Sequence, residues 1–168
     1  MFPSQKLRFL TVSALFAAAI TVMTAYLLHI PLPTGGYVHI GDTLIYLAAC
    51  LLPIPYAAAA SAIGAGLADL LTAPVWVLPT LIIKALVVCF FTNRENKILC
   101  CRNCVAVILA GLFSPAAYAL AGCILAGTTA VFLPQFLGTL VQGIGSGILF
   151  LVIAPAFDAA KVKDGFSL

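Results

Sequence analysis

Six apolar runs dominate the sequence, and they constrain the fold more than any other feature. The runs are Phe9–Ile30, Thr43–Pro53, Tyr56–Thr72, Val75–Thr92, Val105–Ala126 and Leu133–Phe157. Most of them reach the ~20 residues with which a helix crosses ~30 Å of hydrocarbon. None alternates polar and apolar residues as a strand of a membrane β-barrel does. The pattern predicts an all-α polytopic membrane protein with six transmembrane helices. The second run is short for a span, so we expect its helix to begin at about Ile40 and to be tilted or shielded by protein.

The composition agrees with a membrane environment. Hydrophobic residues make up 64% of the chain and charged residues only 8%, and the mean hydropathy is +1.20. Soluble globular domains carry about 25% charged residues. We therefore interpret residues 1–168 as one six-helix transmembrane domain.

The basic residues predict the orientation of the helices. Lysines and arginines precede the first run, lie in the 92–104 connection and follow the sixth run. By the positive-inside rule both termini and this connection are cytoplasmic, an N-in/C-in topology. The connections 31–41, 72–75 and 127–133 contain no Lys or Arg and then face outward. The formal net charge of +3 follows from these loop charges, so no nucleic-acid partner is expected. The first run is also longer than the 7–15-residue core of a cleaved secretory signal.

The chain lacks the common motifs of catalysis and ATP hydrolysis. It contains no G-x-x-x-x-G-K-[ST], H-E-x-x-H or G-x-S-x-G sequence. The cluster Cys100, Cys101 and Cys104 includes a C-x-x-C pair, but structural zinc needs four ligands and both histidines belong to the opposite side. We expect no enzyme, no metal and no cofactor. A membrane enzyme remains an alternative, for which His39 and Asp42 are the acid–imidazole pair close in sequence.

Small residues indicate close helix packing. The glycines of QGIGSG, residues 142–147, and Gly64 and Gly66 are typical of helices that approach one another closely. Ala14 and Ala18 are four residues apart and share one helix face, which favours packing inside the chain or against another subunit.

Polar residues within the apolar runs are the candidate binding residues. Asp69 and Lys84 lie inside spans, where charge is costly, and they form either a structural ion pair or part of a ligand site. Asp42 is placed to cap the second helix, and His39 at a membrane surface is expected to be solvated. Gly35 and Gly36 give the 31–41 connection the freedom to fold over an outward-facing pocket. The full candidate set is Tyr37, His39, Asp42, Asp69, Trp76, Lys84, Tyr118, Gln135 and Gln142.

A resemblance to a known family rests on one long block. The sequence GGYVHIGDTLIYLAACLLPIPYAAAASAIGAGLADLL, followed by PVWVLPTLIIKAL, resembles the substrate-binding S components of energy-coupling factor (ECF) vitamin transporters. The resemblance covers most of residues 8–156. It implies an S-component-like bundle in a bacterial plasma membrane, with an outward pocket gated by residues 31–41. It also implies that Ala14 and Ala18 face a transmembrane coupling subunit, which works with two separate ATPase subunits.

The resemblance specifies the substrate less closely than it specifies the type of transporter. The segments GYVHIGDTLIYLAA, IGAGLADLL and TLIIKAL most resemble the S components associated with salvage of queuosine precursors. A 7-deazaguanine ring offers donors to a carboxylate, acceptors to an amide and a flat face to an aromatic ring. Riboflavin or another ring vitamin remains an alternative, and so does a free-standing proton-coupled carrier with Asp69 and Lys84 as its relay.

Overall fold

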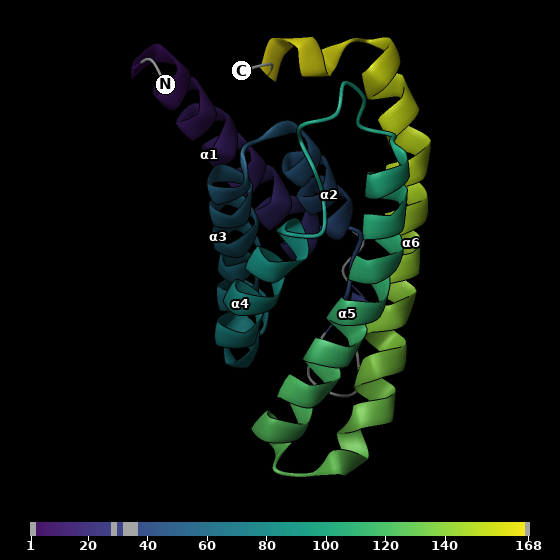
Figure 1. Ribbon diagram of the computed structural model, residues 1–168. Helices are drawn as coiled ribbons and strands as arrows, with labels where there is room; N and C mark the ends of the chain where they lie inside the picture. Colours follow the sequence, from purple (N-terminus) through teal and green to yellow (C-terminus); the bar gives the residue numbers. More distant parts are fainter. Residues whose placement is uncertain (1–2, 28–29, 32–36, 167–168) are drawn as a thin grey trace.

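The computed structural model describes residues 3–27, 30–31 and 37–166. This part of the chain forms six α-helices, shown in Figure 1: α1 (Pro3–Ala25), α2 (Asp42–Leu51), α3 (Ile54–Thr72), α4 (Val77–Val88), α5 (Cys101–Ala126) and α6 (Phe132–Ala159). Three short 3₁₀ helices accompany them: η1 (Pro74–Trp76), η2 (Thr129–Val131) and η3 (Val162–Phe166). Strands β1 (Ile30–Pro31) and β2 (Tyr37–Val38) pair antiparallel, with Ile30 opposite Val38.

Four helices of the described chain have the length and composition of membrane spans. These are α1, α3, α5 and α6, whereas α2 and the Pro74–Val88 segment are shorter. Large apolar side chains cover the outside of the bundle, among them Ile124 at 82% exposure and Leu78 at 69%. In water such a surface would be unfavourable, so its natural surroundings are lipid. The chain is a multi-pass membrane protein; six helices are present, but only four of those described are long enough to span by themselves.

Helix α2 lies inside the bundle. All residues of the segment 45–52 are buried, as expected of a short helix that is apolar on every side. Tyr46 on this helix stacks on Phe91 with ring centroids 4.9 Å apart, and it meets Phe150 of α6 edge-on at 5.9 Å. The helix begins at Asp42, two residues later than expected.

Glycines set the closest helix contacts. A side chain at Gly64 of α3 would come within 2.6 Å of the carbonyl oxygen of Ala17 on α1, and the Thr21 hydroxyl donates to the Gly64 carbonyl at 2.9 Å. A side chain at Gly147 of α6 would lie 2.8 Å from Val107 of α5. The expectation that these glycines serve close packing is confirmed at both positions, but it is wrong at Gly145, where a side chain would meet nothing within 4 Å.

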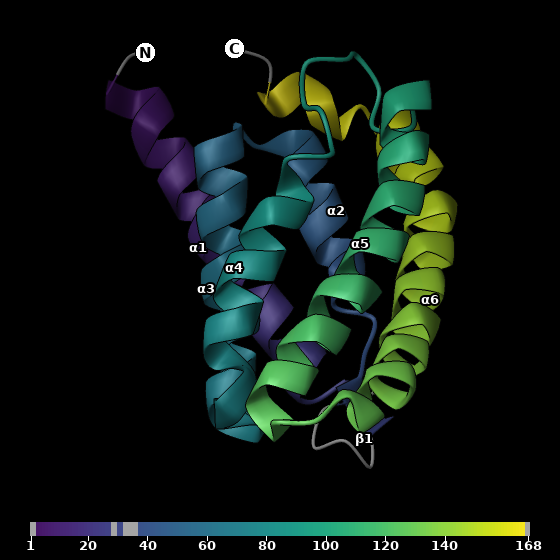
Figure 2. The same cartoon turned by 60° about the horizontal axis from the view of Figure 1, so that its bottom comes forward.

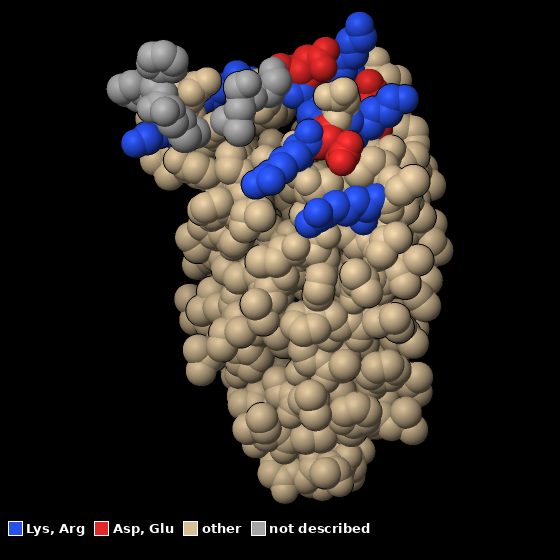
Figure 3. Space-filling view, viewed as in Figure 1, with Lys and Arg blue, Asp and Glu red and all other residues tan. Residues whose placement is uncertain are grey.

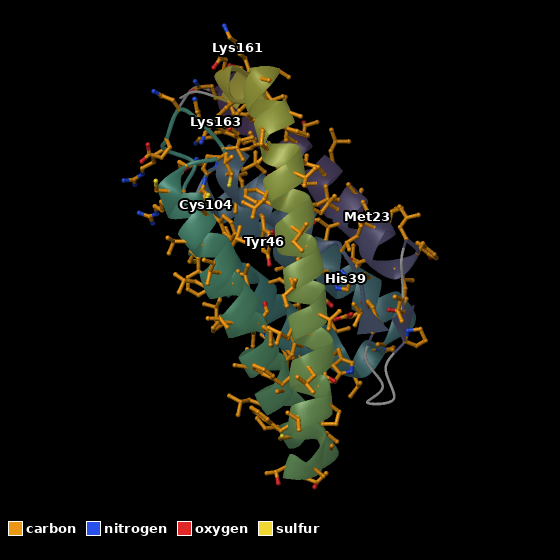
Figure 4. The ribbon with its side chains drawn as sticks, turned by 90° about the vertical axis from the view of Figure 1, so that its right-hand side faces the viewer. Met23, His39, Tyr46, Cys104, Lys161 and Lys163 are labelled. Carbon is orange, nitrogen blue, oxygen red and sulfur yellow. The ribbon has the colours of Figure 1, made fainter. Side chains whose placement is uncertain are left out.

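Both described ends of the chain and the 92–104 connection lie at the same end of the bundle (Figures 1 and 2). The buried Asn103 side chain fixes this connection, because it accepts from the backbone N–H of Thr92 at 2.8 Å and donates to the carbonyls of Thr92 and Ile98. The acidic and basic side chains visible in Figure 3 gather at this end. Figure 4 shows Lys161 and Lys163 there, with His39 well removed from them. We call it the charged end.

Candidate functional site

A small polar cavity lies inside the bundle, on the side of α2 that faces away from the charged end. Its volume is ≈ 30 Å³. Side chains from β2, α3, η1, α4, α5 and α6 converge on it. They are Tyr37, His39, Asp69, Trp76, Thr80, Tyr118, Gln135, Thr139 and Gln142. Seven of these nine residues belong to the candidate set expected from the sequence.

Three buried side chains form a charged cluster next to the cavity. The Lys84 ammonium group donates to both carboxylate oxygens of Asp42, at 2.6 and 2.9 Å, and the Gln142 amide donates to the second oxygen at 3.0 Å. Lys84 also lies 5.1 Å from the centre of the Tyr118 ring, within the range of a cation–π interaction. Asp42 and Lys84 are 2% and 1% exposed. Each buried charge is therefore neutralised by the other.

The start of α2 positions Asp42 for this contact. The Thr43 hydroxyl donates to the carbonyl oxygen of Ser146 on α6 at 2.9 Å, which ties the first turn of α2 to the helix that carries Gln142. The backbone N–H of Gly41 donates to Nδ1 of His39 at 2.9 Å. His39, Gly41 and Asp42 are all buried, so α2 begins in the interior of the bundle.

A second carboxylate faces the cavity without a basic partner in the described chain. The Tyr37 hydroxyl donates a short hydrogen bond to Oδ1 of Asp69. Asp69 is 5% exposed. It lies on the last part of α3, and Tyr37 comes from β2, so the contact links the 31–41 connection to the wall of the cavity.

Aromatic rings form another wall. Trp76 and Tyr118 pack with ring centroids 5.9 Å apart, and the Tyr118 hydroxyl shares a 2.8 Å hydrogen bond with Thr80. Trp76 is 5% exposed, and its indole nitrogen has no hydrogen-bond partner among the described residues. A second cavity of ≈ 180 Å³ borders Trp76 and Gln135 from the apolar side. These two side chains thus separate the polar cavity from a larger apolar one.

Thr80 and Thr139 line the cavity but were not in the candidate set. Trp76, Thr80 and Lys84 follow one another at intervals of four, and Gln135, Thr139 and Gln142 at intervals of four and three. Such spacing places each group on one helix face. Helical periodicity around the chosen residues is the signal that would have found both threonines.

Two expectations from the sequence are wrong, and one of the two interpretations left open for Lys84 is excluded. Lys84 pairs with Asp42 rather than with Asp69. Asp42 does not cap α2, because Gly41 is the N-cap residue and no side chain makes a cap hydrogen bond there. His39 is buried rather than solvated, with 6% exposure. All three have one cause: residues 37–42 turn into the bundle, where hydropathy alone had placed them at the membrane surface.

Comparison with known proteins identifies the family. The sequence matches the family described as ECF-type riboflavin transporter, S component, over residues 4–159. The chain belongs to this family. It is also similar to an uncharacterized protein from Pyrococcus woesei, with 32% identity over 138 residues, which cover 78% of this chain and 88% of that protein.

Membership identifies the chain as a membrane substrate-binding subunit of an ECF transporter, and such subunits are transporter components rather than enzymes. The missing phosphate loop fits an S component, because ATP hydrolysis belongs to other subunits of the transporter. Among the described residues no group of three His, Cys, Asp or Glu side chains could hold a metal ion.

A larger cavity in this S component lies at the charged end. It has a volume of ≈ 590 Å³ and borders the α2–α3 connection, the 92–104 connection and η3. Lys163 lines it and donates to the carbonyl oxygen of Lys97 at 3.5 Å, and burial lowers the pKa of its ammonium group. The positive-inside rule predicts that this end is cytoplasmic, so we do not interpret this cavity as the capture site.

The coupling residues expected on α1 lie away from both cavities. Ala14 and Ala18 are exposed, whereas Ala17 on the neighbouring face contacts α3 through Gly64. Internal packing within the described chain therefore does not account for the alanine stripe.

Proposed function

We propose that this S component captures a ring-shaped micronutrient from outside the cell in the polar cavity and passes it to a coupling subunit driven by two ATPases. Support comes from the family and from one structural observation in particular. Polar side chains from five helical elements and β2 converge in the interior of a molecule that is otherwise 64% hydrophobic. Burying so many polar groups is costly unless they have partners or bind a ligand.

The 31–41 connection is the proposed gate. Residues 32–36, which include Gly35 and Gly36, lie outside the described residues, but both flanks are described. On one flank Tyr37 reaches Asp69 inside the cavity. Ligand pockets commonly measure 300–1,000 Å³, so a vitamin-sized cargo requires the polar cavity of ≈ 30 Å³ to expand. Displacing Tyr37 together with its connection, and rotating Trp76, would join it to the neighbouring cavity.

A queuosine precursor with a 7-deazaguanine ring is our first candidate for the cargo. The ring N–H and amino groups of such a base match a carboxylate acceptor such as Asp69. Its carbonyl and ring nitrogen match the donors offered by Gln135 and the Trp76 indole, and its flat face matches the aromatic wall. Riboflavin is the second candidate, because the family description names it.

The outward face of α1 is the proposed contact with the coupling subunit. The exposed Ala14 and Ala18 leave a shallow strip between larger side chains, among them Leu15 at 66% exposure. Such a strip allows another helix to approach closely in lipid. We place the complete assembly in a bacterial plasma membrane, with the charged end in the cytoplasm.

Binding to the purified protein tests the cavity. Isothermal titration would compare 7-deazaguanine precursors with riboflavin on the wild type and on Gln135→Leu and Trp76→Phe. We expect each substitution to weaken binding of the preferred ligand by ~1–3 kcal/mol, the cost of leaving a buried polar group unmatched. Gln5→Leu makes the same chemical change on α1 near the charged end and serves as the matched control. Unchanged affinity in both cavity variants would contradict the assignment of the site.

A further inference from the structure

The polar cavity has more acidic side chains around it than lysines or arginines. Two acidic side chains, Asp42 and Asp69, and one lysine, Lys84, are buried there. Lys84 is fully engaged by Asp42, with contacts to both carboxylate oxygens. Within the described residues no Lys, Arg or His forms an ion pair with Asp69. The Lys84 ammonium group therefore pairs with Asp42, and the Asp69 carboxyl group has no cationic partner among the described residues.

His39 does not supply the missing positive charge. Its Nδ1 accepts a hydrogen bond from the backbone N–H of Gly41. A ring nitrogen that accepts carries no proton, and both nitrogens of a charged imidazolium are donors. The bond therefore requires neutral His39.

The remaining polar groups that face Asp69 are neutral donors. Tyr37 donates its hydroxyl hydrogen to the carboxylate, and Thr80 and Tyr118 share a hydroxyl hydrogen bond with each other. Hydroxyl donors satisfy hydrogen bonds but leave the net charge unchanged. An ionised carboxylate buried without a counter-ion is unfavourable by several kcal/mol, so a proton neutralises Asp69 in the empty cavity unless a bound cation does.

A second unsatisfied group lies on the same cavity. The Trp76 indole N–H has no acceptor among the described residues, although the ring is 5% exposed. Indole N–H groups usually find an acceptor when buried. Among the described residues, the Asp69 carboxyl group at the cavity thus has no cationic partner, and the Trp76 indole N–H has no acceptor.

We infer that the cargo is a cation, whose positively charged group pairs with Asp69 while an acceptor on its ring receives the Trp76 indole N–H. This inference rests on the proposed function of the cavity, and it narrows the class of substrate. Among 7-deazaguanine compounds it selects those with a protonated aminomethyl group over neutral ones. It also opposes riboflavin, which is neutral at pH 7.

Two ligands that share one ring test the inference. Titration of the purified protein would compare 7-aminomethyl-7-deazaguanine, a cation at pH 7, with neutral 7-cyano-7-deazaguanine. We expect the wild type to bind the cation at least tenfold more tightly. Asp69→Asn should remove this difference, chiefly by weakening the cation. Tyr37→Phe keeps the carboxylate and should keep the preference.

Melting temperature separates a ligand role from a structural one. Because Asp69→Asn replaces an acidic group that has no cationic partner among the described residues, the empty variant should melt at the same temperature as the wild type or higher. A lower melting temperature together with an unchanged preference for the cation would overturn the inference.

Other outcomes distinguish this inference from the proposed function. Equal binding of the two deazaguanines would overturn the cation inference and leave the cavity assignment standing. If neither deazaguanine binds, the same titration is made with riboflavin and with thiamine, which is permanently cationic. Tight binding of riboflavin that survives Asp69→Asn would overturn the inference. Binding of thiamine that is lost in Asp69→Asn would support it. Absence of binding by all four compounds would contradict both proposals.

Discussion

The buried charge of Lys84 is stabilised by its ion pair with Asp42. Replacing Lys84 with methionine leaves the Asp42 carboxylate buried, with the Gln142 amide as its remaining side-chain donor among the described residues. We expect Lys84→Met to lower the free energy of unfolding by about 3–5 kcal/mol, the usual cost of breaking a buried pair on one side. The double variant Asp42→Asn, Lys84→Met should recover part of this loss. Denaturant unfolding in detergent measures both, and a double variant at least as unstable as the single one would contradict the pairing.

At the scale of residues, the sequence located the important side chains better than it located their contacts. Charged and amide groups inside apolar runs were recognisable because burial makes them costly. Their partners were not, since Asp42 reaches Lys84 only after residues 39–41 turn into the bundle. In that turn the backbone N–H of Gly41 donates to His39, a contact that hydropathy does not reveal.

The contact between α1 and α3 depends on the absence of a side chain at Gly64. An added methyl group would meet the Ala17 carbonyl oxygen at 2.6 Å and force the helices apart. We expect Gly64→Ala to destabilise the protein by ~1–3 kcal/mol, as overpacking does. Gly145→Ala on α6 is the matched control, because a methyl group there meets nothing within 4 Å. Alanine favours a helix over glycine by up to ~1 kcal/mol, so thermal unfolding should show the control unchanged or stabilised.

The outer face of α1 should matter for transport and not for binding. Ala14→Trp and Ala18→Trp place bulk where the coupling subunit is proposed to dock, away from the cavity. We expect uptake by the assembled transporter to be abolished while ligand affinity of the isolated chain stays within twofold of the wild type. Ile124→Trp on α5, at 82% exposure, controls for added bulk in lipid. Equal uptake in the α1 variants and the control would contradict the proposal that Ala14 and Ala18 contact the coupling subunit.

At the scale of elements, long helices were predictable and short ones were not. The fifth and sixth apolar runs correspond closely to α5 and α6, because length and hydropathy fix a span. The fourth run was expected to continue to Thr92, but α4 ends at Val88. Asn103 accepts from the Thr92 backbone N–H and donates to its carbonyl, so a contact eleven residues along the chain draws Thr92 away from the helix.

The whole molecule should be oriented with its charged end in the cytoplasm. In a background without native cysteines, we expect Thr129→Cys in η2 to react with an impermeant maleimide added to intact cells. A single cysteine restored at position 101, which is exposed at the start of α5, should react only after permeabilisation. The opposite pattern would place the polar cavity on the cytoplasmic side and exclude it as a capture site.

At the scale of the whole molecule, the basic residues predicted that both ends of the chain and the 92–104 connection share one side, and the described ends and this connection do lie at one end of the bundle in Figures 1 and 2. Short loops rich in lysine and arginine stay on the cytoplasmic side during membrane insertion, so the sequence alone predicts which connections share one side. The family was also recognisable from the block around GYVHIGDTL. The cargo was not, because it depends on the charge balance and shape of a cavity assembled from six elements.

Uptake into vesicles tests the central claim most directly, since an S component captures its cargo but depends on other subunits for energy. Proteoliposomes would contain this chain alone, or this chain with the coupling subunit and both ATPases, and would receive the ligand identified by titration. We predict accumulation only in the complete assembly and only with ATP. Accumulation by the chain alone, driven by a proton gradient and lost in Lys84→Met, would contradict the account and identify a free-standing carrier.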